Sequence, residues 1–204
     1  DYTRYNFRFN LEYDIFPWLK LKPQVSGARY DTMDKSTDIS SLYGLMPWDY
    51  PYDENGELVG YRPASWVKSS GNNYMYDQQW NFVKSTGYEF MGNFDFDVNL
   101  TDWLTFASVN NYRYTNLTRK EYKDPRASNG KGTNGSLGDR VVQTYRVYSN
   151  QLLRFNKTWD VHSLNGVAAY EWNTFTNTFN ESVKGAFAPG FTVGDAAASL
   201  REIK

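Results

Sequence analysis

Apolar and polar side chains alternate strictly along the first segment of the chain. From Tyr5 to Ile15, every odd position is aromatic or aliphatic and every even position is polar. A period of two places these two sets on opposite faces of a β-strand, whereas a helix would scatter the aromatic rings around its circumference. Strands in globular proteins are usually only about 5–6 residues long. The segment therefore predicts an unusually long strand with one apolar and one polar face.

The alternation returns along the rest of the chain. It is clearest over residues 88–100, where Phe94 and Phe96 share one face and Asp95 and Asp97 lie on the other. A weaker alternation predicts four more strands, although Pro23, which has no backbone N–H to donate, lies inside the first of them. These strands are expected over residues 19–30, 104–114, 145–156 and 163–174.

The connections between the expected strands alternate in length. Short turns at one end and long loops at the other are typical of outer-membrane β-barrels, in which the turns face the periplasm and the loops face the outside. We therefore predict an all-β fold, an antiparallel transmembrane β-barrel segment of about six long strands with short periplasmic turns and long extracellular loops. The short connections cover residues 16–18, 101–103 and 157–162, and the long ones 31–87, 115–144 and 175–204.

Aromatic residues are expected at both ends of these strands, because amphipathic rings gather at the two membrane interfaces. The short-turn ends carry tryptophans, and the long-loop ends carry tyrosines and one further tryptophan. The predicted membrane-interface residues are Trp18, Trp103 and Trp159 at the short turns, and Tyr30, Tyr88, Tyr114 and Trp172 at the long loops.

The composition excludes several other kinds of site. The 204 residues contain no Cys and one His, which excludes a disulfide scaffold, a thiolate zinc site, an iron–sulfur cluster and a His-rich metal centre. The formal net charge of −1 argues against a nucleic-acid-binding domain, which would carry a basic excess. We therefore expect no metal site, no cofactor and no nucleic-acid partner.

Two other interpretations remain open on the residues alone. A secreted, aromatic-rich β-sandwich that binds glycans would also show period-two strands, Asn/Gly turns and an excess of Tyr and Trp. The strand lengths and the 57-residue segment 31–87 favour the barrel, because loops of that length are uncommon inside compact domains. A glycoside hydrolase fragment would need a positioned pair of carboxylates, which the sequence does not identify. We therefore expect no enzymatic activity.

Several stretches resemble barrel strands of SusC/RagA-type TonB-dependent outer-membrane transporters. They occur in the same order as in that family and together cover most of the chain. Three combine an alternating strand with the turn beside it, and the fourth is an acidic piece of loop. The stretches are Arg4–Tyr13 with Trp18-Leu19, Gly92–Leu100 with Trp103-Leu104, Asn150–Lys157 through His162–Asn165 to Tyr170-Glu171, and Pro51–Glu57.

The resemblance implies that residues 1–204 are an internal part of a larger barrel domain, without the plug domain and the remaining strands. Transporters of this class have 22 strands and a plugged lumen, and even the smallest membrane barrels have eight strands. The resemblance also implies TonB-dependent import of oligosaccharides or peptides across the bacterial outer membrane. The implied partners are a SusD-like surface lipoprotein, the TonB–ExbB–ExbD complex and outer-membrane lipid. The plug and the TonB-interacting segment of the family are not recognised in this sequence.

The first long loop offers the candidates for cargo binding. Exposed aromatic rings can stack on sugar rings, and their OH and NH groups can bond to polar cargo; alternatively, they pack the loop on itself or against a lid subunit. The segment Asp53–Glu57 predicts a polar turn rather than a calcium loop, because the twelfth position, Ala64, is not a carboxylate. The candidate ligand-binding residues are Trp48, Tyr50, Tyr52, Trp66, Tyr74 and Trp80.

Carboxylates also follow the polar faces of the expected strands. On a barrel wall they should line a wet lumen and contact the plug, and nothing pairs them as acid–base catalysis requires. His162 has no nucleophile motif beside it and is expected at a tight turn. The polar-face carboxylates are Glu12, Asp14, Glu89, Asp95 and Asp97.

Overall fold

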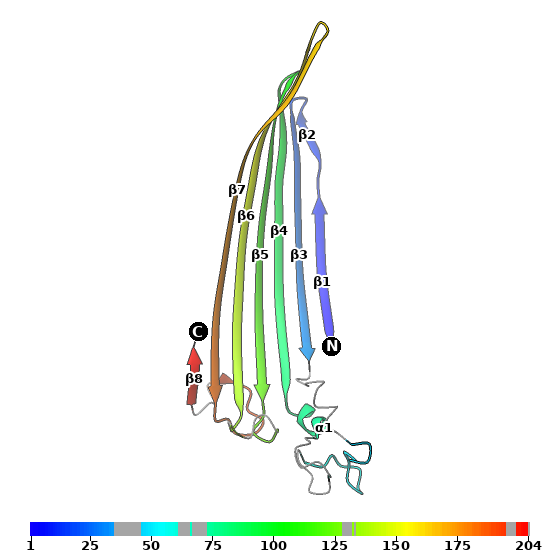
Figure 1. Ribbon diagram of the computed structural model, residues 1–204, viewed down its shortest axis with the longest axis vertical. Helices are drawn as coiled ribbons and strands as arrows, with labels where there is room; N and C mark the ends of the chain where they lie inside the picture. The colour runs from blue at the N-terminus through cyan, green and yellow to red at the C-terminus, as the bar shows by residue number, and fades with distance from the viewer. Residues whose placement is uncertain are drawn as a thin grey trace.

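The fold is one tall antiparallel sheet, with strands in the order β1-β3-β4-β5-β6-β7-β8 and with β2 also paired to β3 (Figure 1). The computed structural model describes residues 1–34, 46–60, 66, 73–127, 132, 134–194 and 199–203. Among these residues, no helix has the length and apolar character needed to cross a membrane. The elements are β1 (Tyr2–Asn10), β2 (Tyr13–Phe16), β3 (Leu19–Asp34), α1 (Tyr74–Gln78), β4 (Phe82–Thr101), β5 (Leu104–Lys123), β6 (Ser136–Trp159), β7 (His162–Gly185) and β8 (Ser199–Ile203).

The first predicted strand forms as two strands in line, β1 and β2, which both pair with β3. The break lies at Leu11, whose N–H donates to the carbonyl oxygen of Pro23 at 3.0 Å. The return hydrogen bond cannot form because proline has no N–H, so the ladder is interrupted at that position. The proline therefore breaks the neighbouring edge strand, whereas β3 itself continues through Pro23 opposite Phe94.

The other strands are longer than predicted at their loop ends. β5 reaches Lys123 and β6 begins at Ser136, so most of the loop predicted over 115–144 is strand. β7 likewise continues to Gly185, inside the predicted tail, and β8 pairs with its last residues. Polar residues occupy both faces of these extensions, and the period-two signal fades there. The backbone ladder continues because it does not depend on side-chain polarity.

Each successive short turn lies further along the strand direction than the one before it. β3 begins at Leu19 opposite Val98, whereas β4 continues from Val98 to Thr101 before its turn. β5 begins opposite Phe155, and β6 again continues beyond it to Trp159. In Figure 1 the β6–β7 hairpin consequently projects furthest at the short-turn end. A progressive stagger of this kind accompanies the strand tilt of a closed barrel.

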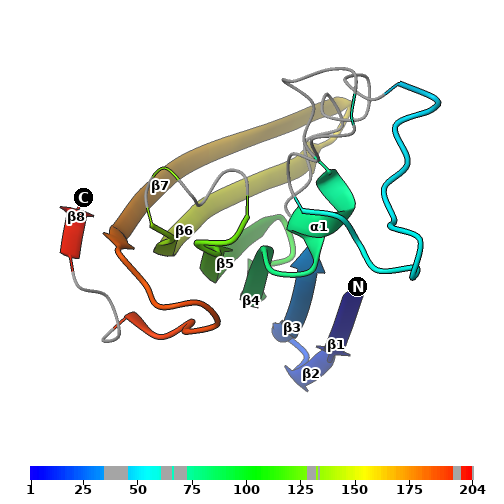
Figure 2. The ribbon, with the colours of Figure 1, turned by 90° about the horizontal axis from the view of Figure 1, so that it is seen from below.

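The sheet excludes the β-sandwich interpretation. Figure 2 shows the strands side by side in one curved layer, and Figure 1 shows α1 at the end of the sheet opposite the short turns. All the named strands belong to this sheet, so the described residues contain no second sheet to pack against it. β6 and β7 each have 24 residues, far beyond the usual strand of a sandwich.

A tyrosine ring covers a glycine near the loop end of the sheet. Tyr30 of β3 lies opposite Gly87 of β4, and its ring occupies the space that a Cβ atom at Gly87 would need. We expect Gly87→Ala to displace this ring and to destabilise the complete protein by about 1–3 kcal/mol in denaturant titration. Gly92→Ala is the matched control on the same strand, because its nearest neighbour is the Phe90 ring at 3.8 Å. Equal stability of the two variants would contradict this explanation.

Candidate functional site

The register divides the sheet into an apolar face and a polar face. Residues that pair across antiparallel strands project from the same face and form transverse rows. One row of the apolar face joins Leu19, Val98, Phe106, Leu153 and Ala168. The adjacent row on the other face joins Lys20, Asp97, Ala107, Leu152 and Ala169, and charged residues recur along that face.

Aromatic residues pack together at the short-turn end of the apolar face. The ring of Phe155 lies between those of Trp103 and Trp159, with centroids 5.3 Å and 6.1 Å away. The ammonium group of Lys157 lies 4.6 Å from the centroid of Trp103. Trp18, in the β2–β3 turn, is half exposed. Amphipathic rings next to a lysine are typical of a membrane interface.

At the loop end, Tyr88, Tyr114 and Trp172 all project from the apolar face, and Tyr114 packs against Tyr145 at 4.8 Å. The segment from Leu104 to Tyr114 lies between the two aromatic groups and covers about the 9–11 residues that a tilted strand needs to cross a bilayer. The interface role of these residues stays a prediction.

Tyr30 does not belong to the loop-end aromatic group. It pairs with Arg4 and Gly87 on the polar face, whereas Tyr88 pairs with Arg29 on the apolar face. Tyr30 thus lies on the opposite face from Tyr88, Tyr114 and Trp172, and its expected interface role stays a prediction. Tyr30 and Tyr88 lie in neighbouring paired rows, and side chains of neighbouring rows point to opposite faces. The sequence alone did not fix the register that places them there.

Four polar side chains interrupt the apolar face between β5 and β6. The Asn110 amide donates to Ser108 Oγ and to the Phe94 carbonyl oxygen, at 2.8 Å and 2.9 Å. Its carbonyl oxygen accepts from Ser149 Oγ at 2.8 Å and from Gln151 Nε2 at 3.4 Å. These groups satisfy one another, which lowers the cost of placing them on an apolar surface. They also explain why the alternation is weak in 104–114 and 145–156.

Four of the five predicted polar-face carboxylates pair with cations, and the fifth, Asp95, accepts the Asn110 N–H at 3.0 Å. Lys20 Nζ lies 2.9 Å from a Glu12 oxygen and 3.6 Å from an Asp14 oxygen. Lys22 Nζ lies 2.6 Å from Asp97. All are partly solvent-exposed, so each pair contributes little to stability. The described residues contain no group of three or more His, Cys, Asp or Glu side chains that could hold a metal ion.

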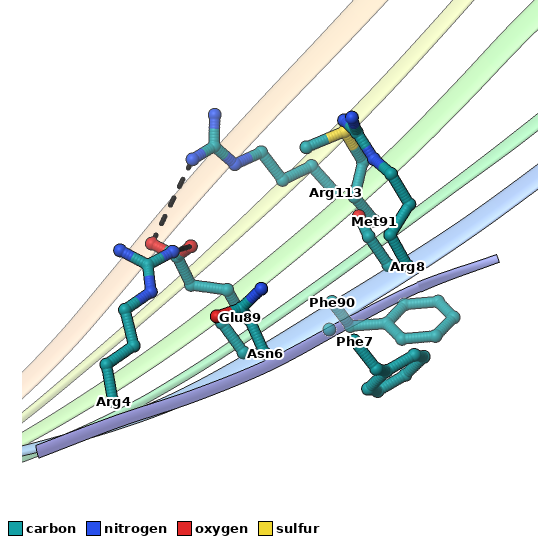
Figure 3. A pocket seen from close by; sticks show the side chains of 11 residues that line it. Arg4, Asn6, Phe7, Arg8, Glu89, Phe90, Met91 and Arg113 are labelled. Atoms are coloured by element: carbon teal, nitrogen blue, oxygen red, sulfur yellow. Dashed lines mark ion pairs between the residues drawn. The ribbon is translucent and has the colours of Figure 1, made fainter.

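Further along the same face, two arginines contact one glutamate and two more lie on the adjacent paired row of that face. We call the four the arginine cluster: Arg4, Arg8, Arg113 and Arg146. Arg4 Nη2 lies 3.6 Å from one Glu89 oxygen, and Arg113 Nη2 lies 4.0 Å from the other. Figure 3 shows both arginines pointing toward Glu89 from different strands, while Phe7 and Phe90 lie on the other side of the sheet. Three of these arginines, with Glu89, line a cavity of about 390 Å³.

Small residues of β3 form the floor of this cavity. Ser26 and Ala28 lie on the polar face between β1 and β4, and Ser26 separates Arg8 from Met91. The short side chains leave open space between the long side chains of the neighbouring strands. Sequence reasoning identified Glu89 but missed the arginines. The alternation alone could have placed these arginines on the polar face. It could not have predicted that they lie close together, because that depends on the register between strands far apart in the sequence.

The six aromatic candidates of the first long loop are not alike. Trp48 and Tyr50 are 66% and 71% exposed, whereas Trp66 is 6% exposed and its Nε1 donates to the Tyr50 carbonyl oxygen at 3.2 Å. The indole of Trp80 is covered by the Arg126 guanidinium, 3.5 Å from its ring centroid. Trp66 and Trp80 therefore contact neighbouring loop residues, and cargo binding stays a prediction for all six: Trp48, Tyr50, Tyr52, Trp66, Tyr74 and Trp80.

The predicted polar turn in this loop is confirmed. Tyr52 and Leu58 form a β-bridge, and Asp53 Oδ1 accepts the backbone N–H groups of Asn55 and Glu57, both at 2.9 Å. Gly56 has a φ of 81°, in the left-handed region that a turn of this kind requires. The expected turn position of His162 is also confirmed, since it is the first residue of β7.

A buried carboxylate joins three loops at the loop end of the sheet. Asp124 is 1% exposed, and Arg126 donates to both of its oxygens, from Nε at 2.7 Å and from Nη2 at 2.9 Å. The Tyr122 hydroxyl and the Gly190 N–H donate to it as well, each at 3.1 Å. Through Arg126 the cluster also reaches Trp80. We call these five residues the Asp124 cluster.

The environment of the Asp124 cluster shifts two pKa values. Burial raises the pKa of Asp124, but the hydrogen bonds from Arg126, Gly190 and Tyr122 outweigh it and lower the pKa to about 2. Burial and the negative charge of Asp124 raise the pKa of Tyr122 to about 12. Both groups lie well beyond Tyr114 on the loop side. The carboxylate therefore stays ionised, and the phenol neutral, at ordinary pH.

Comparisons with known proteins identify the fold rather than a close relative. No model of a protein family matches the chain, and no curated protein similar in sequence is found. Three solved structures match 100% of the chain: the RagAB peptide importer in the closed-closed state (TM-score 0.75, 18% identity), the RagAB peptide transporter (0.80, 16%) and the importer in the open-open state (0.78, 18%). The chain spans 24% of the length of each matched chain. The predicted RagA-like barrel segment is thus confirmed at the level of fold.

Proposed function

We propose that this chain is part of the wall of an outer-membrane β-barrel importer. The observation that carries the proposal is the two-faced sheet, whose apolar face is bounded by aromatic residues at both ends of a bilayer-length span. The likeness in fold to chains of a peptide importer supports it over the whole length of the chain.

The open edges of the sheet support a larger barrel. β1 and β2 pair only with β3, and β7 pairs with β8 only over its last residues among those described. The rest of β7, from His162 to Asn180, is exposed along its length. Long unpaired edges recruit further strands, and in a membrane the backbone groups of an edge must be paired. In this proposal the remaining strands of the complete protein close the barrel.

The proposed partners are those that the resemblance to SusC/RagA-type transporters implies, placed on the two faces and the loops. The apolar face contacts outer-membrane lipid, and the polar face lines a lumen that holds a plug domain. The long loops meet the cargo and a SusD-like surface lipoprotein, and the TonB–ExbB–ExbD complex energises import. The matched structures are of a peptide importer, which favours peptides over oligosaccharides as cargo.

The proposal is tested on the complete protein that contains these residues. We expect it to fractionate with outer membranes, to need detergent for extraction, and to migrate faster on a gel before boiling than after it, because closed barrels resist unfolding. Uptake of a labelled oligopeptide should require both this protein and TonB. Recovery of the protein in a soluble fraction, or uptake that is equal without it, would contradict the proposal.

A further inference from the structure

We propose that the arginine cluster binds carboxylate groups of peptide cargo and makes the importer selective for acidic peptides. This inference rests on the proposed import function and adds the charge of the cargo to it. The residues that carry it are Arg4, Arg8, Arg113 and Arg146, with Glu89 in contact with Arg4 and Arg113.

The charge at this level of the polar face is strongly one-sided. Three consecutive transverse rows cross β1, β3, β4, β5, β6 and β7, and all their residues are described. They contain four arginines and a single carboxylate, that of Glu89. Elsewhere on the same face acids and bases are balanced, as in the pairs of Lys20 with Glu12 and Lys22 with Asp97. The excess is therefore local and is not a property of the whole chain.

Two of the arginines lie directly opposite each other. Arg113 of β5 and Arg146 of β6 are cross-strand partners on the same face. Like charges at opposite positions destabilise a sheet. The contact of Arg113 with Glu89 is long, at 4.0 Å, and Arg146 lies over the ring of Phe175 at 5.4 Å. An anion placed between the two guanidinium groups would offset this repulsion, so the pair favours binding of a negatively charged group.

The shape and the donors of the site fit a carboxylate. The small residues Ser26 and Ala28 leave a hollow between Arg8 of β1 and Arg113 of β5. Guanidinium groups bind carboxylates through paired N–H···O bonds, a geometry that neutral sugars do not match with the same strength. A peptide offers such groups at its C-terminus and in Asp and Glu side chains. The hollow and its donors therefore favour an acidic peptide.

The arginine cluster also lies at the loop-side end of the proposed membrane span, where cargo would enter the barrel. Arg113 and Arg146 are the sequence neighbours of Tyr114 and Tyr145, and Glu89 is the neighbour of Tyr88. These tyrosines form the loop-end aromatic group of the opposite face. The arginine cluster is therefore level with the loop-side boundary of the proposed membrane span, and cargo passing the loops and the loop-side strand ends would reach it before the part of the wall inside the membrane.

The test compares two synthetic nonapeptides on the complete importer. One contains three Asp residues and a free C-terminal carboxylate, and the other contains Asn at those positions and a C-terminal amide. The variant is Arg113→Gln combined with Arg146→Gln. Arg154→Gln is the control, because Arg154 lies on the same face of β6 but nearer to the short turns, away from the cluster. Affinity is measured by calorimetry and uptake with the labelled peptides.

We expect the double variant to bind the acidic peptide at least about tenfold more weakly, with little change for the neutral peptide, because hydrogen bonds to a charged group are lost. Arg154→Gln should leave both affinities unchanged. Equal affinity of the wild-type protein for both peptides would overturn the inference while import stands. Loss of thermal stability with unchanged discrimination would overturn it too, because the cluster would then hold a carboxylate of the protein itself. A wild-type protein that takes up neither peptide would overturn the proposed function as well.

Discussion

Replacing Phe94 by arginine is expected to destabilise the complete barrel by about 2–4 kcal/mol. Phe94 projects from the apolar face of β4, is 52% exposed, and lies about midway between the short turn after Thr101 and the loop-end Tyr88. Its position is therefore near the middle of the proposed membrane span. An arginine there would have to leave water for hydrocarbon, and the cost of this transfer is largest at the midplane of the bilayer.

The measurement is the free energy of unfolding of the complete protein in phospholipid vesicles, by denaturant titration. Asn93→Arg is the matched control, because it adds the same charge one residue away on the polar face, where Asn93 donates to Gln24 at 3.3 Å. We expect this change to cost less than about 1 kcal/mol. If Asn93→Arg were the more costly change, the assignment of the two faces would be inverted.

Much of the fold could be predicted because alternation reports directly on a two-faced strand. The aromatic residues from Tyr5 to Ile15 and the Phe pairs of 88–100 gave a clear signal, and strands form at both places. The loop-side extensions of β5 and β6 could not be predicted in the same way. Outside a bilayer both faces of a strand are polar, so the extension is held by backbone pairing that side-chain patterns do not report.

The candidate site could be predicted only in part, because it depends on contacts between strands that are far apart in the sequence. Glu89 was expected on the polar face, and the structure brings it to Arg4 and Arg113. Which arginines meet depends on the register, and a shift of one residue would turn every side chain to the other face. Tyr30 shows the consequence, because its place near a strand end was predicted from the sequence, whereas its face depends on the register.

The aromatic residues of the loop illustrate a second limit. Tryptophan at an exposed loop and tryptophan in a loop core look alike in sequence, and only burial separates Trp48 from Trp66. Trp80 is fixed by an arginine that lies in another loop. The strand ends and the loops there share a small core, in which Tyr122 of β5, Leu137 of β6 and Phe187 are buried.

Removing the buried carboxylate at the centre of these loops should have the second large effect. We expect Asp124→Asn to destabilise the loop end of the sheet by about 2–4 kcal/mol, because Arg126 loses its charged partner and an amide cannot accept all the hydrogen bonds that converge there. Arg126 is 35% exposed, which lets water replace part of the loss. Limited proteolysis of the loops in the complete protein measures the effect. Asp139→Asn is the control, because Asp139 is more exposed and lies 3.9 Å from Lys120.

Acid should reproduce this mutation in the wild-type protein. The pKa of Asp124 is about 2 in the folded protein, against about 3.9 for an unfolded chain, so its ionised form favours the folded state. A depressed carboxyl pKa gives a contribution that is complete above about pH 4 and is lost as the pH falls through about 2, and a shift of this size is worth about 2–3 kcal/mol. The loops of the wild-type protein should therefore become more sensitive to an acid-active protease between pH 4 and pH 2. The Asp124→Asn protein, which has no group to protonate there, should lack this step, and the same acid step in both proteins would assign it to another carboxylate.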